Sequence, residues 1–234
     1  MSLAADITSL RDDRLHKLND LHDDYDHTRK LRRMQQVAVE RYAESQTFHN
    51  RITGTRMTGN ELAALTGASL RRLNEQTFKE IIGQFELFAT DLLRLWLTEH
   101  IDLVEDKALD IATLFHSSSL EAVRQRALRE AVESTVLKKA YSTPEKWFRY
   151  IHEILGANIV SAADINGFAE MKATRDLLEH ADGIVNSVYL ERAGGLARSP
   201  AGVRISVDNV YHTNAFNLVR RLIEDTANAA IAAA

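Results

Sequence analysis

The sequence predicts an all-α protein, a helical bundle with a long, charged helical extension at its N-terminus. Three observations support this fold class. The 234 residues include only two prolines, aromatic residues make up 7%, and one long segment repeats its apolar residues at helical spacing. In that segment, from Phe78 to Trp96, apolar side chains three and four residues apart form one face. We assign residues 1–58 to the extension and residues 59–234 to the helical domain.

The extension is predicted to be a helix from about Ala5 to Gln46. Its stripe is too irregular for a heptad seam, which favours a helix packed on the main domain over a coiled coil, although both remain open. Residues 50–59, with two glycines, are the predicted hinge. The apolar stripe among the dense charges of the extension consists of Leu10, Leu15, Leu18, Leu21, Tyr25, Leu31, Met34 and Val37.

Capping signals place the middle helices. Residues 103–115 give no firm prediction, but the three serines at 117–119 can cap a helix that continues to about Leu137. The sequence Thr-Pro-Glu at 143–145 then starts a short helix, because proline is tolerated in the first turn and glutamate suits its positive end. Gly156 is predicted to end that helix.

The next predicted helix carries the residues of greatest chemical interest. Ser161, with Asp164 three residues later, resembles a capping box and opens a helix that runs to about Ala181. Gly183 follows and can end it, because glycine accepts the left-handed conformation common after helices.

The C-terminal part is predicted to contain a short extended segment and a final helix. Residues 203–207 alternate apolar and polar side chains, as a strand or an extended arm would. Asp208 can cap the final helix. The alanine-rich end, residues 227–234, is expected to fray.

Composition excludes several classes of protein. The chain has no cysteine, which excludes disulfide frameworks, thiolate zinc sites and cysteine nucleophiles. Its net charge of −4 argues against a histone-like or polybasic protein. No segment approaches the roughly 20 apolar residues of a membrane span, and no leader pattern is visible. We therefore expect a cytoplasmic protein with no membrane partner.

No cofactor or metal is predicted. The templates for phosphate-binding loops, nucleophile elbows and zinc helices are missing from the sequence. His22 with Asp26, and Asp23 with His27, have a spacing of four residues that could hold a divalent cation. A solvated helix face with local charge pairs is the favoured interpretation, because no further ligands are obvious elsewhere.

The candidate catalytic residues lie near the end of the helix that Ser161 opens. Asp176 and His180 share a helix face, whereas Arg175 and His180 are five residues apart and point about 140° away from each other. Spacing alone favours a structural interpretation, with His180 at the negative helix end and Arg175 bonded to an acid such as Glu179.

The run RDLLEHADGIVNSVYLERAG, residues 175–194, resembles the signature of the HEPN superfamily, in particular its RiboL-PSP-HEPN-like and Apea-like subgroups. Arg175, Asp176 and His180 fall on the motif positions. Residues 85–93 resemble the long second helix of these domains, and residues 144–156 resemble the helix before the motif. The resemblance spans roughly residues 69–223 and leaves the first 60 residues uncovered.

The resemblance implies a metal-independent endoribonuclease in which two protomers join their motif helices in one composite cleft. His180 would be the general acid or base, and Arg175 would hold the phosphate. Asp176 replaces the asparagine most often seen at its position, and its charge would repel RNA. Glu86 is either a supporting group near the cleft or a simple exposed residue.

The implied partners are RNA and a second copy of the chain, with an antitoxin or a defence-system protein as a further candidate. Phage defence and a toxin–antitoxin role are both compatible with the family. Residues 172–221 carry seven basic and five acidic side chains, which gives slight support for RNA. The alternative is a catalytically inactive helical module that binds RNA or a protein.

Overall fold

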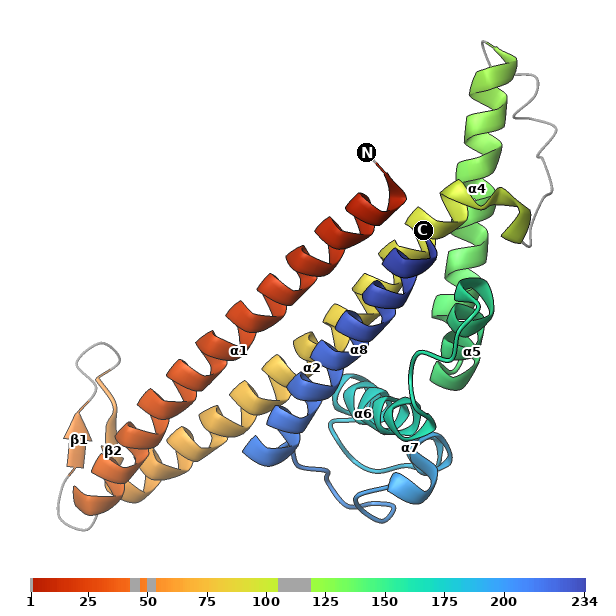
Figure 1. The fold of residues 1–234 in the computed structure, drawn as a ribbon. Helices are drawn as coiled ribbons and strands as arrows, with labels where there is room; N and C mark the ends of the chain where they lie inside the picture. The colour runs from red at the N-terminus through yellow and green to blue at the C-terminus, as the bar shows by residue number, and fades with distance from the viewer. Residues whose placement is uncertain (1, 43–46, 50–53, 105–118) are drawn as a thin grey trace.

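The protein is built from long helices and has a small two-stranded hairpin at one end (Figure 1). The computed structural model describes residues 2–42, 47–49, 54–104 and 119–234. The elements, in chain order, are α1 (Leu3–Tyr42), β1 (Thr47–His49), β2 (Arg56–Thr58), α2 (Gly59–Glu99), the 3-10 turn η1 (Ile101–Leu103), α4 (Leu120–Ala140), α5 (Pro144–Leu155), α6 (Ala162–His180), α7 (Ser187–Ala193), the 3-10 turn η2 (Gly194–Leu196) and α8 (Asn209–Ala233). The predicted all-α class is confirmed.

Helices α1, α2 and α8 form an extended layer. Figure 1 shows α1 and α2 running side by side, joined at one end through the hairpin, with α8 alongside α2. At 40 residues, α1 spans about 60 Å. Its Ile7 and Leu18 are fully buried in the main core, so the predicted extension is a helix packed on the domain.

The predicted core face of α2, from Phe78 to Trp96, is confirmed, and Leu97 extends it by one residue. Phe85 lies at the centre of an aromatic cluster, with ring centroids 5.3 Å from Phe148 of α5 and 4.9 Å from Phe168 of α6. All three rings are fully buried. This cluster joins the long layer to α5 and α6, and so fixes the base on which the candidate site stands.

The predicted hinge at residues 50–59 needs correction. Arg56–Thr58 form β2, which pairs antiparallel with β1, and residues 50–53 lie outside the described part. Gly59 begins α2 instead of breaking the chain, since the Thr58 side chain caps the helix and Glu61 completes the capping box. Strand signals were too short to predict this hairpin.

The expected fraying of the alanine-rich end is wrong. Helix α8 continues to Ala233, and Ala227 and Ala230 are fully buried. Small side chains at a spacing of three residues allow close packing here. Arg11 of α1 donates a hydrogen bond of 3.0 Å to Asn228, which ties this end to the first turns of the chain. The alternating segment at 203–207 is extended and forms an isolated bridge between Arg204 and Ile184.

Most predicted capping sites are confirmed. The Ser119 side chain accepts from the backbone of Ala122, Gly156 ends α5 with a φ of 68°, and the Ser161 side chain accepts from the Asp164 backbone. Residues 105–118, which include the uncertain segment and two of the three serines, lie outside the described part.

Candidate functional site

Helix α6 divides its side chains between a buried face and a charged face. Phe168, Ala173, Thr174 and Leu177 are buried against the domain. The exposed and half-buried side carries the charged residues, which are Lys172, Arg175, Asp176, Glu179 and His180. The amphipathic spacing of the helix therefore presents the motif residues at the surface.

The turn after α6 explains why position 183 is a glycine. The backbone N–H groups of Ala181 and Gly183 both donate to the carbonyl of Leu177, at 3.0 Å each. Gly183 has a φ of 73°, and an added Cβ would lie 3.2 Å from the Leu178 side chain. Both the conformation and the space favour glycine at this position. Asn186 then caps α7 by accepting from the Tyr189 backbone.

A chain of alternating charges crosses the exposed surface of α6. Glu86 of α2 pairs with Lys172, and its other oxygen lies 3.4 Å from the Arg175 guanidinium. Arg175 also donates to Asp176 at 3.0 Å, and Asp176 accepts from Arg192 of α7 at 2.9 Å. Two carboxylates, one from α2 and one from its own helix, thus hold the Arg175 guanidinium in place.

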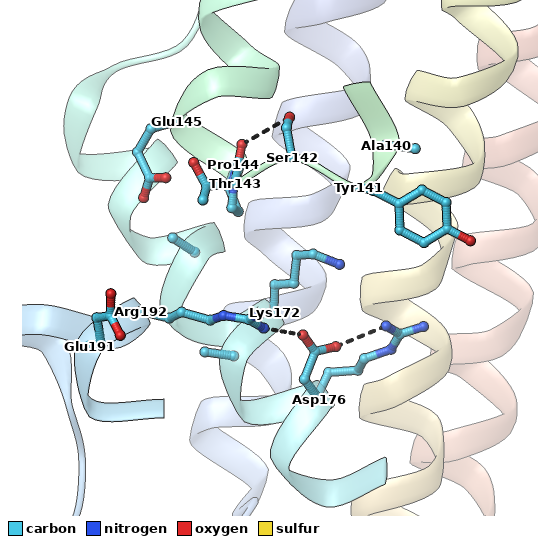
Figure 2. A pocket seen from close by; sticks show the side chains of 13 residues that line it. Ala140, Tyr141, Ser142, Thr143, Pro144, Glu145, Lys172, Asp176, Glu191 and Arg192 are labelled. Atoms are coloured by element: carbon cyan, nitrogen blue, oxygen red, sulfur yellow. Dashed lines mark hydrogen bonds and ion pairs between the residues drawn. The ribbon is translucent and has the colours of Figure 1, made fainter. Parts of the chain in front are cut away.

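All of these charged residues except Glu86 line a pocket of about 430 Å³ between the α4–α5 connection, α6 and α7. Figure 2 shows Asp176 between two basic side chains on one wall, with residues 141–145 above them. Tyr141 is 89% exposed at the mouth of this pocket. The first turn of α5 also faces the pocket, and its Thr143 makes no side-chain capping bond.

His180 is the last residue of α6 and lies outside the pocket lining. Its side chain is exposed and makes no hydrogen bond or ion pair with any residue in the described ranges. Its neighbour Glu179 pairs with Lys79 of α2 at 2.7 Å, and this ammonium lowers the pKa of the Glu179 carboxyl. The alternative predicted pair, Arg175 with Glu179, is replaced by the pairs of Arg175 with Glu86 and Asp176.

A buried carboxylate joins the helices that carry the pocket residues. Glu170 is only 4% exposed, and its carboxylate accepts hydrogen bonds from the Tyr189 and Tyr211 hydroxyls at 2.8 and 2.6 Å. Arg198 donates to it at 3.1 Å and stacks on the Tyr211 ring. Burial raises the pKa of Tyr211 well above its ordinary value. The network joins α6, α7, α8 and the loop between the last two, and so positions Arg192.

The structure brings together three of the four predicted site residues, Arg175, Asp176 and Glu86, and leaves His180 apart from them. Lys172, Arg192 and Tyr141 were not among the predicted site residues. Lys172 lies one turn before Asp176, so helical spacing could have found it. The contact of Arg192 with Asp176 depends on how the 181–186 turn folds back, which no local pattern encodes.

The seven basic side chains of residues 172–221 do not form a free basic surface. Each of them has an acidic partner, and the pairs not yet described are Arg204 with Glu75, Arg220 with Glu224 and Arg221 with Asp164. Arg221 lowers the pKa of the Asp164 carboxyl through their hydrogen bond. RNA phosphate would therefore have to replace a carboxylate wherever it bound these cations.

The histidine and aspartate cluster of α1 does not converge on a metal site. His22 stacks on Phe216 of α8, with ring centroids 4.0 Å apart, while Asp26 pairs with Arg29 and Lys30. Within the described ranges, no three His, Cys, Asp or Glu side chains are grouped as metal ligands. None of the described helices has the apolar length needed to cross a bilayer.

Comparison of the chain with protein-family models, curated proteins and solved structures gives no match.

Proposed function

We propose that this protein is a metal-independent endoribonuclease of the HEPN type, which acts as a homodimer with a composite cleft. The observation that carries the proposal is the placement of the motif on α6. Arg175 lines an open pocket, and His180 lies exposed at the end of the same helix without an ion-pair or hydrogen-bond partner among the described residues. Arg175 and His180 of one helix point in different directions. A two-fold axis that brings a second α6 alongside would let Arg175 and His180 of the two copies face the same cleft.

In this mechanism His180 takes the proton of the ribose 2′-hydroxyl or gives a proton to the leaving oxygen. The 2′-oxygen forms a bond to phosphorus while the bond from phosphorus to the 5′-oxygen breaks, and the 5′-oxygen leaves protonated. The products are a 2′,3′-cyclic phosphate and a 5′-hydroxyl. Imidazole suits both proton transfers, since its ordinary pKa lies near neutrality.

Arg175 stabilises the charge that develops on the phosphate, because its planar guanidinium can bond two oxygens at once. Glu86 orients this side chain from the side of α2. Asp176 holds the same guanidinium and also Arg192. An incoming phosphate has to displace the Asp176 carboxylate, so Asp176 opposes substrate binding.

The second candidate function is a catalytically inactive helical module that binds RNA or a protein partner. The observation that favours it is the complete pairing of the site cations, since Arg175 already contacts two carboxylates. Such a module keeps its affinity for RNA after His180→Ala and cleaves RNA in neither form.

The deciding experiment incubates the purified protein with single-stranded RNA and excess chelator. We expect cleavage to 2′,3′-cyclic phosphate ends, no cleavage of DNA, and loss of activity in His180→Ala. Arg175→Lys should lose most activity, because an ammonium keeps the charge without the two-point contact. His27→Ala, which removes an exposed histidine of α1, is the matched control and should remain active.

Three results would contradict this mechanism: cleavage that requires metal, equal cutting of DNA, or full activity in His180→Ala. Sedimentation of the same preparation tests the composite cleft. A clean monomer at micromolar concentration would rule out a site shared between two copies. The family resemblance also suggests a role in phage defence or in a toxin–antitoxin pair. Either role would imply a cognate protein partner.

A further inference from the structure

Tyr141 is the most exposed large apolar residue of the described chain, at 89%. It lies at the C-terminus of α4, where its backbone N–H donates to the Leu137 carbonyl. Its ring makes no aromatic contact, and its hydroxyl makes no hydrogen bond, with any residue in the described ranges. A single exposed aromatic ring is common on protein surfaces. Tyr141 is of interest because it lines the same pocket as several basic side chains.

The backbone beneath this ring is held firmly. Both the backbone N–H and the hydroxyl of Ser142 donate to the Lys139 carbonyl, at 2.9 and 2.6 Å. Pro144 then fixes the start of α5 through its ring. The connection between the two helices therefore holds the Tyr141 backbone at a defined place on the pocket rim, so binding has to order the side chain alone.

Below the ring, the same pocket contains three cations, Lys172, Arg175 and Arg192. Figure 2 places Lys172 and Arg192 on the pocket wall, with Asp176 bonded to the Arg192 guanidinium. An aromatic face above a group of Arg and Lys side chains is the combination by which proteins bind single-stranded nucleic acid. The ring stacks on a base and the cations hold the adjoining phosphates. An acidic peptide would use the cations alone and would leave the ring uncovered.

We infer that this pocket binds one unpaired nucleotide of single-stranded RNA, with its base stacked on Tyr141 and its phosphate between Lys172 and Arg192. The inference deepens the proposed ribonuclease function and depends on it for the identity of the ligand. The nucleotide lies next to the bond that is cut, because Arg175 belongs to both the pocket and the motif. A base inside a duplex cannot turn its face to the ring, so the pocket selects unpaired RNA. Stacking accepts every base, so no strong base preference follows.

The four carboxylates near the pocket set the conditions for binding. Glu145 and Glu191 line the pocket. Asp176 pairs with Arg175 and Arg192, and Glu86 pairs with Lys172 and Arg175. Phosphate takes the place of Asp176 at Arg192 in the bound state. Binding should therefore be moderate and should weaken steeply with salt.

The test measures the affinity of the wild-type protein for a labelled 2′-O-methyl oligoribonucleotide, which lacks the 2′-hydroxyl and cannot be cut. We expect Tyr141→Ala to weaken binding about tenfold, the usual effect of losing one stacked base, and Tyr141→Phe to bind like the wild type. Arg192→Gln should weaken binding and lower the slope of log affinity against log salt by about one. Met34→Ala, an exposed apolar residue on α1, is the matched control and should have no effect.

Equal binding by Tyr141→Ala and the wild type, equal affinity for a duplex of the same sequence, or a loss in Tyr141→Phe as large as in Tyr141→Ala would each overturn the subsite. So would failure of the wild type to bind the oligonucleotide. Cleavage of unmodified RNA is measured separately. If the wild type cleaves but Tyr141→Ala binds normally, only the subsite fails. If Tyr141→Ala loses binding and no form cleaves, the subsite stands and the nuclease proposal fails.

Discussion

The long layer of α1, α2 and α8 and the charged surface of α6 and α7 are held by different forces. In the layer, Tyr25 of α1 stacks on His212 of α8 with ring centroids 3.6 Å apart, and His22 stacks on Phe216. On the surface of α6, the contacts are ion pairs between half-exposed side chains. Apolar and stacked contacts contribute most of the stability of a fold, whereas exposed ion pairs contribute about 0–1 kcal/mol each. The α6 surface can therefore change its charges for function at little cost in stability.

The largest expected effect concerns the layer. Phe85→Ala removes a fully buried ring from the aromatic cluster and should lower the free energy of unfolding by about 3–5 kcal/mol. Leu87→Ala, two residues along the same helix, is the control, since its side chain is 50% exposed. Urea denaturation measures both variants. Similar midpoints for the two would show that the layer is not the stabilising part of the molecule.

The second effect is a pH dependence that arises in the same layer. His212 is fully buried beside His22 and Arg29, and burial, followed by its electrostatic interactions with these two side chains, lowers its pKa from 6.5 to about 4. Its ring nitrogen lies 2.8 Å from the Thr77 hydroxyl. Because the unfolded chain binds the proton more readily, the contribution of His212 is complete above pH 6.5 and is lost as the pH falls toward 4. The difference amounts to about 3 kcal/mol.

Thermal unfolding between pH 7 and pH 4 measures this slope. His212→Gln should start less stable at pH 7 and lose less stability on acidification than the wild type. Other carboxyl groups of the chain also begin to take up protons as the pH approaches 4, so the comparison is between the two slopes. Parallel curves for the wild type and the variant would contradict the assignment to His212.

The smallest effect on stability is expected at the α6 surface, where Asp176→Asn should change the free energy of unfolding by less than about 1 kcal/mol. The same change releases Arg175 and Arg192 from a carboxylate, so RNA cleavage should rise several-fold or at least persist. Asp13→Asn, which removes an exposed carboxylate paired with Lys17 on α1, is the control for a general charge effect. Unfolding curves and cleavage rates are measured on the same samples. A marked loss of stability in Asp176→Asn, or a fall in its cleavage rate, would remove the contrast between the two regions.

Local patterns predicted most of the helices and fewer of the site contacts. The buried face from Phe78 onward could be predicted because burial of one side of a helix imposes a period of 3.6 residues. The helix ends at Ser161 and Gly156 could be predicted because these positions need particular side chains or conformations. The hairpin of Thr47–His49 and Arg56–Thr58 could not be predicted, because strands of three residues are too short to show an alternating pattern. The alanines at the end of α8 were predicted to fray, because an alanine-rich sequence does not indicate whether its side chains pack against another helix.

Arg175 and Asp176 were found through a motif, but their partners come from other helices. The pairs of Arg175 with Glu86 and of Asp176 with Arg192 join residues 89 and 16 positions apart, and they exist only after α2, α6 and α7 have packed. Tyr141 gave no signal, because an exposed tyrosine at a helix end has no periodic neighbours. Tertiary packing, which spacing does not encode, creates this part of the site.

The contact between α1 and α8 has a consequence for the order of folding. The hydrogen bond of Arg11 with Asn228 closes a loop of 217 residues, and that of Tyr25 with Asn209 closes one of 184. The Glu170 network, by contrast, spans residues 170–211 and can close early. Because closing a long loop costs more entropy, α1 should complete its contacts last, after α8 has left the ribosome. Until then the first helix has α2 as its only long partner among the described helices, and the part of its apolar face that α8 covers stays exposed to water.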